Sequence, residues 1–242
     1  MRPSGRGNNK TREVRIETNV NNYAEGSCLI KQGNTHIICT ATVEKKVPPF
    51  LRGKGSGWVI AEYNMIPRAT QERVQRDGAG TRPNSRKLEI QRLIGRSLRG
   101  VIDTIALGER QIIVDCDVIQ ADGGTRCASI TGGFVAMYLA VENLLKRRKI
   151  KYNPINGYVS AISCGIYKET PILDLDYDED STCEADVNFI MNEEGKIIEV
   201  QGTAEGNPFT FEQIQSMYTL AKTGCDYLLE IQKKALGKIY EF

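Results

Sequence analysis

Two glycines, a threonine and an arginine precede an apolar stretch of helical spacing, in the run ADGGTRCASITGG from Ala121 to Gly133. A tight glycine turn that opens a helix leaves backbone N–H groups unpaired beside the positive end of the helix dipole, which favours an anion. Next to Gly124, the Thr125 hydroxyl and the Arg126 guanidinium add donors that suit phosphate. The alternative is an ordinary glycine turn at the start of a helix.

Carboxylates are concentrated between residues 174 and 186, where seven acidic residues and no basic one occur. In LDLDYDED they alternate with apolar residues, so we expect Asp174 and Asp176 to coat a solvated strand face. Asp180 and Asp186 fall at the two ends of the turn between two alternating runs. Paired carboxylates repel each other unless a cation or a shared proton intervenes, and such oxygen ligands suit Mg²⁺ or Mn²⁺. On spacing alone, a functional pair and a merely solubilising pair are equally open.

Arg86 is a third candidate, in a segment with nine basic and three acidic residues between Arg68 and Arg99. Ser85 is the predicted cap of a helix that runs to about Arg99 and ends at Gly100. Arg86 lies four residues before the first apolar position of that helix, so we expect it on the inward face, where a guanidinium needs an anionic partner. A structural ion pair is the alternative. A fold that joined this basic segment to the acidic one could grip a polyanion.

Alternating runs about residues 32–34 and 192–195 predict two hairpins, and GWVIAEYNMI, RQIIVDCDVIQ and NGYVSAISCGIY predict further strands. One helix follows Arg126, and another begins at a T-x-x-Q capping box formed by Thr210 and Gln213. A hairpin followed by a helix therefore occurs twice. We expect an α+β fold of two similar β-β-α halves packed as a single domain over residues 1–242. Residues 1–10, which are polar, glycine-rich and basic, predict a mobile arm.

The 242-residue chain has 32 basic and 30 acidic residues, so its net charge of +2 says little about a nucleic-acid partner. We expect neither a membrane span nor a signal peptide, because no apolar run is long enough. Seven scattered cysteines without metal-ligand spacing suit the reduced thiols of a cytosolic protein. His36 is the single histidine and stands within a predicted strand, and no P-loop motif occurs, which disfavours His-dependent nucleophiles and P-loop chemistry.

Five segments resemble the bacterial ribonuclease PH family, whose relatives are polynucleotide phosphorylase and the exosome ring subunits. They are GWVIAEYNMIPRAT, NSRKLEIQRLIGRSLRG, DGGTR, EDSTCEADVNFIM and VQGTAEG, in this order. The resemblance extends over nearly the whole chain, and five motifs in one order are far more specific than any one of them. It implies the RNase PH fold, which is of the ribosomal protein S5 domain 2-like type.

The resemblance implies a phosphate-dependent 3′→5′ exoribonuclease that trims precursor tRNA, releases nucleoside diphosphates and runs in reverse as a tRNA nucleotidyltransferase. Carried over by position, it implies a phosphate site at Arg86, Gly124, Thr125 and Arg126, catalytic and metal-binding carboxylates at Asp180 and Asp186, and RNA-binding arginines at Arg68, Arg73 and Arg76. Mg²⁺ or Mn²⁺ and inorganic phosphate are the implied cofactor and co-substrate. A cytoplasmic homo-oligomer without membrane contact, a hexamer built as a trimer of dimers, is implied as well.

Two other functions are open. A non-catalytic RNA-binding ring subunit of an exosome-like assembly would lack part of the arginine and carboxylate set, and this chain has all of it. A metal-dependent hydrolytic nuclease would use the two aspartates without needing an anion site at the glycine turn. The reaction products distinguish phosphorolysis from hydrolysis.

Overall fold

The first half of the chain forms a five-stranded sheet in the computed structural model, which describes residues 2–76, 85–205 and 207–237. The strands are β1 (Val14–Thr18), β2 (Gly26–Gln32), β3 (Thr35–Glu44), β4 (Trp58–Met65) and β5 (Gln111–Gln120), in the order β1-β2-β3-β5-β4. The β2–β3 hairpin confirms the turn expected at residues 32–34. β4 lies parallel to β5, a pairing that alternation alone does not reveal.

Helices α1 (Ser85–Arg99) and α3 (Thr125–Lys146) pack on this sheet and on each other, and the short helices η1 (Pro49–Leu51) and α2 (Thr104–Leu107) lie in its connections. α1 ends at Arg99 as the sequence predicts, whereas Ser85, the predicted cap, is already its first residue, and its apolar positions are buried as expected. α3 is long and apolar enough to cross a membrane by length and composition, but 72% of its apolar window is buried inside the protein. It is therefore placed as a core helix.

The second half forms a four-stranded antiparallel sheet. Its strands are β6 (Val159–Tyr167), β7 (Thr170–Leu173), β8 (Ala185–Asn192) and β9 (Ile197–Ala204), in the order β7-β6-β8-β9. The one-turn helix α4 (Tyr177–Asp180) connects β7 to β8. α5 (Phe211–Ala235) packs on this sheet and begins at the capping box of Thr210 and Gln213, as the sequence predicts.

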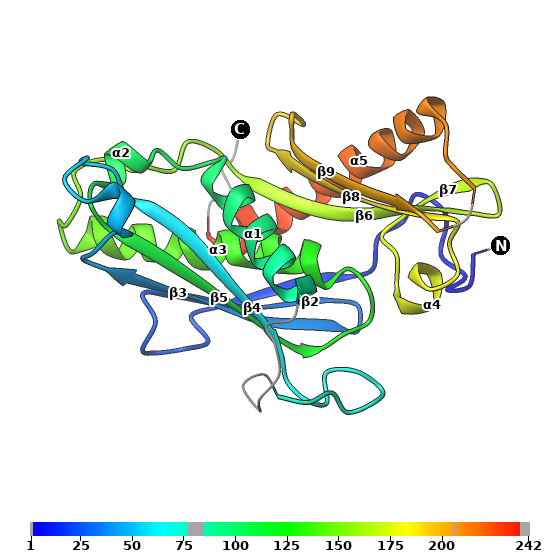
Figure 1. The fold of residues 1–242 in the computed structure, drawn as a ribbon, viewed down its shortest axis with the longest axis horizontal. Coiled ribbons are helices and arrows are strands. Elements are labelled where there is room, and N and C mark those ends of the chain that lie inside the picture. Colours follow the sequence, from blue (N-terminus) through cyan, green and yellow to red (C-terminus); the bar gives the residue numbers. More distant parts are fainter. Residues whose placement is uncertain (1, 77–84, 206, 238–242) are drawn as a thin grey trace.

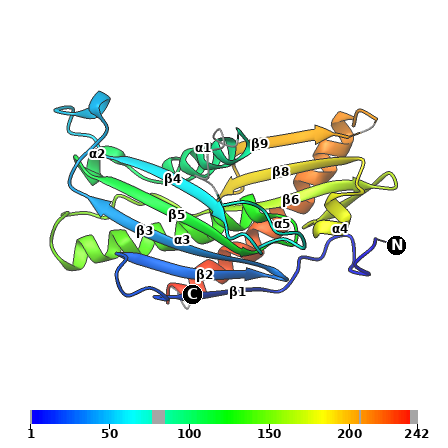
Figure 2. The same cartoon turned by 60° about the horizontal axis from the view of Figure 1, so that its bottom comes forward.

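The two halves share one contiguous cluster of buried apolar side chains, which runs from the first sheet through α3 to the second sheet and α5. Gln232 of α5 fastens the junction, because its amide donates to the carbonyls of Thr131 in α3 and Val159 in β6, each at 2.9 Å. Figures 1 and 2 show the two sheets side by side. A sheet with its helix in each half confirms the α+β fold expected from the sequence.

Residues 2–10 pack against the second half, whereas their composition predicts a mobile arm. Arg2 is 3% exposed, and its Nε and Nη2 donate to the carboxylate of Glu179 at 2.7 and 2.6 Å. Arg6 donates to the same carboxylate at 2.9 Å, and the carbonyl of Asn8 accepts from the amide of Leu173 at 2.8 Å. Composition misleads here because the anionic partner lies 177 residues further along the chain from Arg2.

Candidate active site

The chain leaves β5 and turns through two glycines in the left-handed region, Gly123 at φ 72° and Gly124 at φ 67°, before α3 begins. A β-carbon on Gly123 would lie 2.6 Å from the carbonyl oxygen of Leu175, so only glycine fits there. Gly124 is the N-cap of α3 and has no side chain to bond the first N–H groups of the helix. The helix start therefore has the form of the anion site that the sequence predicts.

Thr125 and Arg126 lie in the first turn of α3, and each meets a side chain from another element. The hydroxyls of Thr125 and Tyr63 are 2.9 Å apart. The Arg126 guanidinium is 21% exposed and lies 3.5 Å from the amide oxygen of Gln201 and 3.7 Å from a carboxylate oxygen of Glu89. Sequence reasoning assigned these three neighbours no role. Their positions inside three of the family-like segments are the only signal that could have found them.

Asp180 and Asp186 come from different elements. Asp180 is the last residue of α4, and Asp186 lies in β8, opposite Gly165 of β6 and Thr203 of β9. Desolvation by the surrounding protein raises the pKa of both carboxyls, and the charge of Asp180 further raises the pKa of Asp186. The two carboxyls are therefore close enough to interact, and both hold a proton more readily than an ordinary aspartate.

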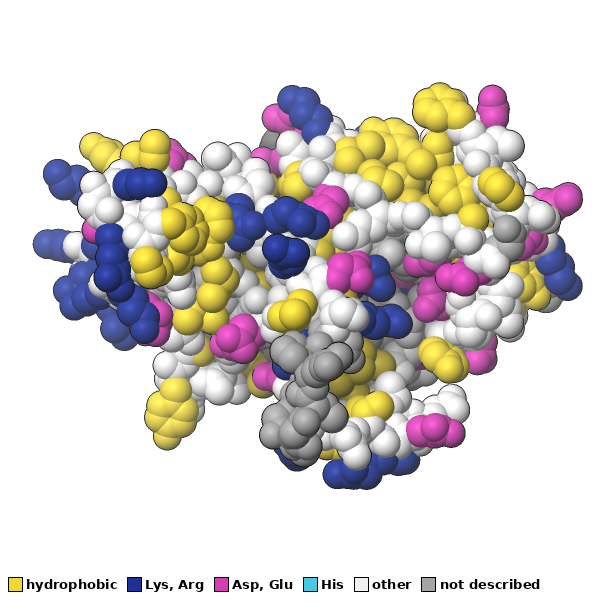
Figure 3. All heavy atoms as spheres, in the orientation of Figure 1, with side chains coloured by type: hydrophobic (Ala, Val, Ile, Leu, Met, Phe, Trp, Pro, Cys, Tyr) yellow, Lys and Arg dark blue, Asp and Glu magenta, His cyan; other side chains and the backbone are white. Residues whose placement is uncertain are grey.

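Two arginines of the predicted phosphate site act on these carboxylates. The charges of Arg126 and Arg86 oppose the desolvation that raises the pKa of Asp180, and Arg126 does the same at Asp186. The structure thus brings four predicted side chains together from α1, α3, α4 and β8. Arg86 is exposed and does not face inward as expected, because the buried face of α1 begins only at Ile90. On the face of the molecule drawn in Figure 3, basic side chains lie next to acidic ones near the middle.

The carboxylates of Asp180 and Asp186 are the candidate ligands for a divalent cation at this site. The described residues contain no group of three or more His, Cys, Asp or Glu side chains placed to hold a metal ion. Asp180 and Asp186 offer two carboxylates, and the charge of Glu205 acts on both. Mg²⁺ keeps several waters and binds through one or two carboxylates together with substrate phosphates, so this donor set suits it.

Asp174 and Asp176 do not coat a solvated strand face. The chain turns out of β7 through Asp174, whose φ is 57°, and its side chain is fully buried. That carboxylate accepts from Arg12 Nη2 at 2.7 Å and from Gln32 Nε2 at 2.8 Å. Asp176 is the N-cap of α4 and accepts from the amide of Glu179 at 3.1 Å. The alternation in LDLDYDED therefore reflects an ion pair and a helix cap instead of a strand.

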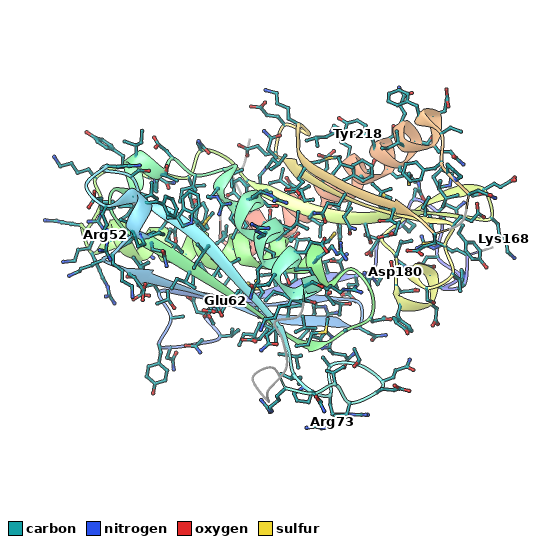
Figure 4. All side chains as sticks on the ribbon, viewed as in Figure 1. Arg52, Glu62, Arg73, Lys168, Asp180 and Tyr218 are labelled. Atoms are coloured by element: carbon teal, nitrogen blue, oxygen red, sulfur yellow. The ribbon has the colours of Figure 1, made fainter. Side chains whose placement is uncertain are left out.

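The three loop arginines predicted to bind RNA lie on the connection between β4 and α1. They are Arg68, Arg73 and Arg76, and all three are exposed. Figure 4 shows Arg73 on a loop that projects from the body of the protein, away from Asp180. Within one chain Arg73 therefore lies apart from the carboxylate site.

Comparison with known proteins matches both halves of the chain. The sequence model of the 3′ exoribonuclease family, domain 1, matches residues 10–141, and that of domain 2 matches residues 157–224. A protein of Methylobacterium radiotolerans named Ribonuclease PH is 53% identical over 237 residues, which cover 98% of this chain and 100% of that protein.

Solved structures with the same fold have low sequence identity to this chain. Rice (Oryza sativa) Rrp46 matches with a TM-score of 0.78 at 16% identity, over 97% of this chain and 100% of that one. The Archaeoglobus fulgidus exosome with RNA bound to the active site matches at 0.77 and 19%, over 94% and 91%. An archaeal exosome core matches at 0.74 and 18%, over 96% and 90%. These structures support the architecture of two packed halves.

Proposed function

The chain belongs to the 3′ exoribonuclease family, and we propose that it holds inorganic phosphate at the first turn of α3 and directs it at the 3′ end of RNA. Its activity is that of a phosphate-dependent 3′→5′ exoribonuclease that trims precursor tRNA and, in reverse, acts as a tRNA nucleotidyltransferase. One observation carries the assignment of the site. The glycine turn that opens α3 packs on the backbone of residues 175 and 176 and bonds the first amide of α4, the helix that Asp180 ends.

Phosphate would be held by the guanidinium groups of Arg86 and Arg126, the Thr125 hydroxyl and backbone N–H groups from Gly124 onward. One phosphate oxygen attacks the phosphorus of the last phosphodiester, and the bond from that phosphorus to the preceding 3′ oxygen breaks. A nucleoside diphosphate leaves, and the shortened RNA takes up a proton on its 3′ oxygen. In this proposal Asp186 supplies that proton, and desolvation together with the charge of Asp180 raises the pKa of its carboxyl above the ordinary value. Positioning and charge neutralisation provide most of the rate in such transfers.

Asp180 and Asp186 are the residues that would hold Mg²⁺ or Mn²⁺. The fit rests on their chemistry, since the charge of Asp180 raises the pKa of Asp186, the charge of Glu205 acts on both, and a divalent cation relieves such repulsion. A bound ion would neutralise negative charge on the reacting phosphates.

RNA is held, in this proposal, by the exposed arginines of the loop between β4 and α1, which contact phosphates without reading sequence. Two structural neighbours are archaeal exosomes, which supports an oligomer, and we propose a homo-hexamer built as a trimer of dimers. The seven cysteines are buried free thiols, which supports a reducing, cytoplasmic location.

Chromatography of the products from a 3′-tailed tRNA, incubated with and without phosphate, tests the function. We expect nucleoside diphosphates with phosphate and no degradation without it, while sulfate at equal ionic strength does not substitute. Release of nucleoside monophosphates would identify a hydrolase and refute the phosphate site. A non-catalytic ring subunit is not favoured, because the 53% identical relative is named Ribonuclease PH and the chain carries the full arginine and carboxylate set.

A further inference from the structure

The glycine turn before α3 is held by two side chains, those of Thr35 in β3 and of Arg12 just before β1. Thr35, at the start of β3 and fully buried, donates to the carbonyl of Gly123 at 2.7 Å and accepts from the amide of Asp122 at 3.0 Å. Arg12 donates through Nη1 to the carbonyl of Asp122 and lies 3.5 Å from that of Gly123. Two successive carbonyls of the turn are thus fixed on one side.

Arg12 is itself fixed, because it lies in a buried ion pair. Its Nη2 and Nε donate to the two carboxylate oxygens of Asp174 at 2.7 and 3.1 Å, and its backbone amide donates to the same carboxylate at 2.6 Å. The Arg12 side chain is 7% exposed and that of Asp174 is 0% exposed. A bidentate pair of this kind leaves the guanidinium little freedom, so the carbonyls that it binds are held firmly.

Because the peptide group is planar, the contacts that fix the carbonyls of the turn also fix the direction of its N–H groups. The peptide bonds of the turn are trans, so each N–H points opposite to the carbonyl of the same unit. With the carbonyls of Asp122 and Gly123 directed at Arg12 and Thr35, the N–H groups of Gly123 and Gly124 point away from them. Such successive N–H groups at a helix start form a concave anion site.

The same turn contacts the element that carries the carboxylates. The Asp122 side chain accepts from the amide of Tyr177 at the start of α4 at 3.3 Å, and Gly123 packs on the backbone of residues 175 and 176. Asp180 ends that helix. A displacement of the turn would therefore change the distance between the phosphate and Asp180.

We propose that Arg12 and Thr35 are positioning residues for phosphate, acting through the carbonyls of the turn without touching the ion. The proposal rests on the proposed function, since it assumes that phosphate binds at Gly124 to Arg126. It predicts an effect on phosphate and not on RNA, because neither side chain is exposed.

Thr35→Val and Thr35→Ser form the test, since the first removes the hydroxyl and the second keeps it. We expect Thr35→Val to raise the KM for phosphate about tenfold, because the hydrogen bonds to the Gly123 carbonyl and from the Asp122 amide are both lost. Thr35→Ser restores the KM to within about twofold of the parent chain, and RNA affinity is the same in all three proteins. Phosphate-induced protection against thermal unfolding, which needs no turnover, should weaken in parallel for Thr35→Val. Where Thr35→Val does not fold, Arg12→Lys is the second variant, since an ammonium cannot bridge both carbonyls and Asp174.

An unchanged phosphate KM and unchanged phosphate protection in Thr35→Val would overturn the inference, as would equal losses of phosphate and RNA affinity. These outcomes differ from failure of the proposed function. In that case the parent chain itself would show no dependence on phosphate and no protection by it.

Discussion

The negative charge of Asp180 raises the pKa of Asp186 across the gap between α4 and β8. Both carboxyls are partly desolvated, and the charge of Glu205 adds to the repulsion. Folding therefore gathers like charges in one place, and ionisation of this pair opposes the stability of the folded chain.

Asp186→Asn should stabilise the protein at neutral pH. The pKa of Asp186 in the folded chain lies above the ordinary value of 3.8, so its ionisation lowers the free energy of unfolding as the pH rises through the folded pKa. We therefore expect the Tm of the variant at pH 7 to exceed that of the parent chain. The difference should shrink as the pH falls through the folded pKa and disappear below the ordinary value of 3.8. Thermal unfolding between pH 3 and 8 measures it, and a gap that does not vary with pH would contradict the repulsion.

Asp186→Asn should also abolish the stabilisation of the protein by a divalent cation and should slow turnover. We expect Asp186→Asn to bind RNA normally while its turnover falls about 100-fold or more, because a proton donor and a metal ligand are lost. Mg²⁺ should raise the Tm of the parent chain but not of the variant, and chelation should reverse that rise. Asp178→Asn is the matched control, because this exposed carboxylate lies on α4, the short helix that Asp180 ends. Equal Mg²⁺ protection of both variants would place the metal elsewhere.

Gly123→Ala should push the glycine turn before α3 away from α4, the helix that Asp180 ends. The new β-carbon would lie 2.6 Å from backbone atoms of Leu175 and Asp176, in addition to the strain of alanine at φ 72°. Gly53→Ala is a close control, since its φ is 71° and no atom lies within 4 Å of the added carbon. We expect phosphorolysis to fall at least about tenfold only in Gly123→Ala, because displacing a positioned group even slightly has large effects. Equal activity of the two variants would show that the turn tolerates the separation.

Local signals in the sequence were sufficient for most elements. The hairpin turns, the span of α1 and the capping box at Thr210 depend on residues within one or two turns of each other, and the structure confirms them. The convergence of Arg86, Arg126, Asp180 and Asp186 was predicted through five ordered motifs rather than through spacing, since these residues come from four elements.

The errors arose where a distant partner decides the local structure. Asp174 alternates with apolar neighbours like a strand residue, yet Arg12, 162 positions earlier, makes it a buried ion-pair partner. Arg2 belongs to a segment of disordered composition, yet Glu179 holds it in the protein interior. Alternation and composition report on neighbours in the chain, whereas a buried charge is tolerated only because of its partner in space.

Replacing the three loop arginines by alanine should weaken tRNA binding and flatten its dependence on salt. They are Arg68, Arg73 and Arg76. If each contacts one phosphate, the slope of the logarithm of affinity against that of salt concentration should fall by about two to three. A short oligonucleotide that occupies only the active site should lose less affinity. Titrations at four salt concentrations measure both slopes.

The control for that experiment is a second exposed basic run that follows the end of α3 and lies outside the loop. It consists of Arg147, Arg148 and Lys149. Their replacement by alanine should leave the salt slope unchanged, since basic residues at a helix C-terminus serve its dipole. A slope that falls equally in both triple variants would show that tRNA binding depends on overall charge and not on the projecting loop.

The ionisation of Glu179 should make the free energy of unfolding depend on pH in the acid range. Burial opposes its ionisation, but hydrogen bonds from Arg2 and Ser4 and the charge of Arg2 outweigh burial and lower its pKa to about 2. Relative to the ordinary value of 4.5, this lowering contributes about 3 kcal/mol of stability, present above pH 4.5 and lost as the pH falls towards 2. Glu179→Gln should lack this acid-sensitive part and unfold about 6–12 °C lower at pH 7. Trypsin should then cleave after Arg6 and Lys10 faster than in the parent chain, because the N-terminal segment loses its ionic partner. Cleavage at the parent rate, together with an unchanged Tm, would show that residues 2–10 are held by other contacts.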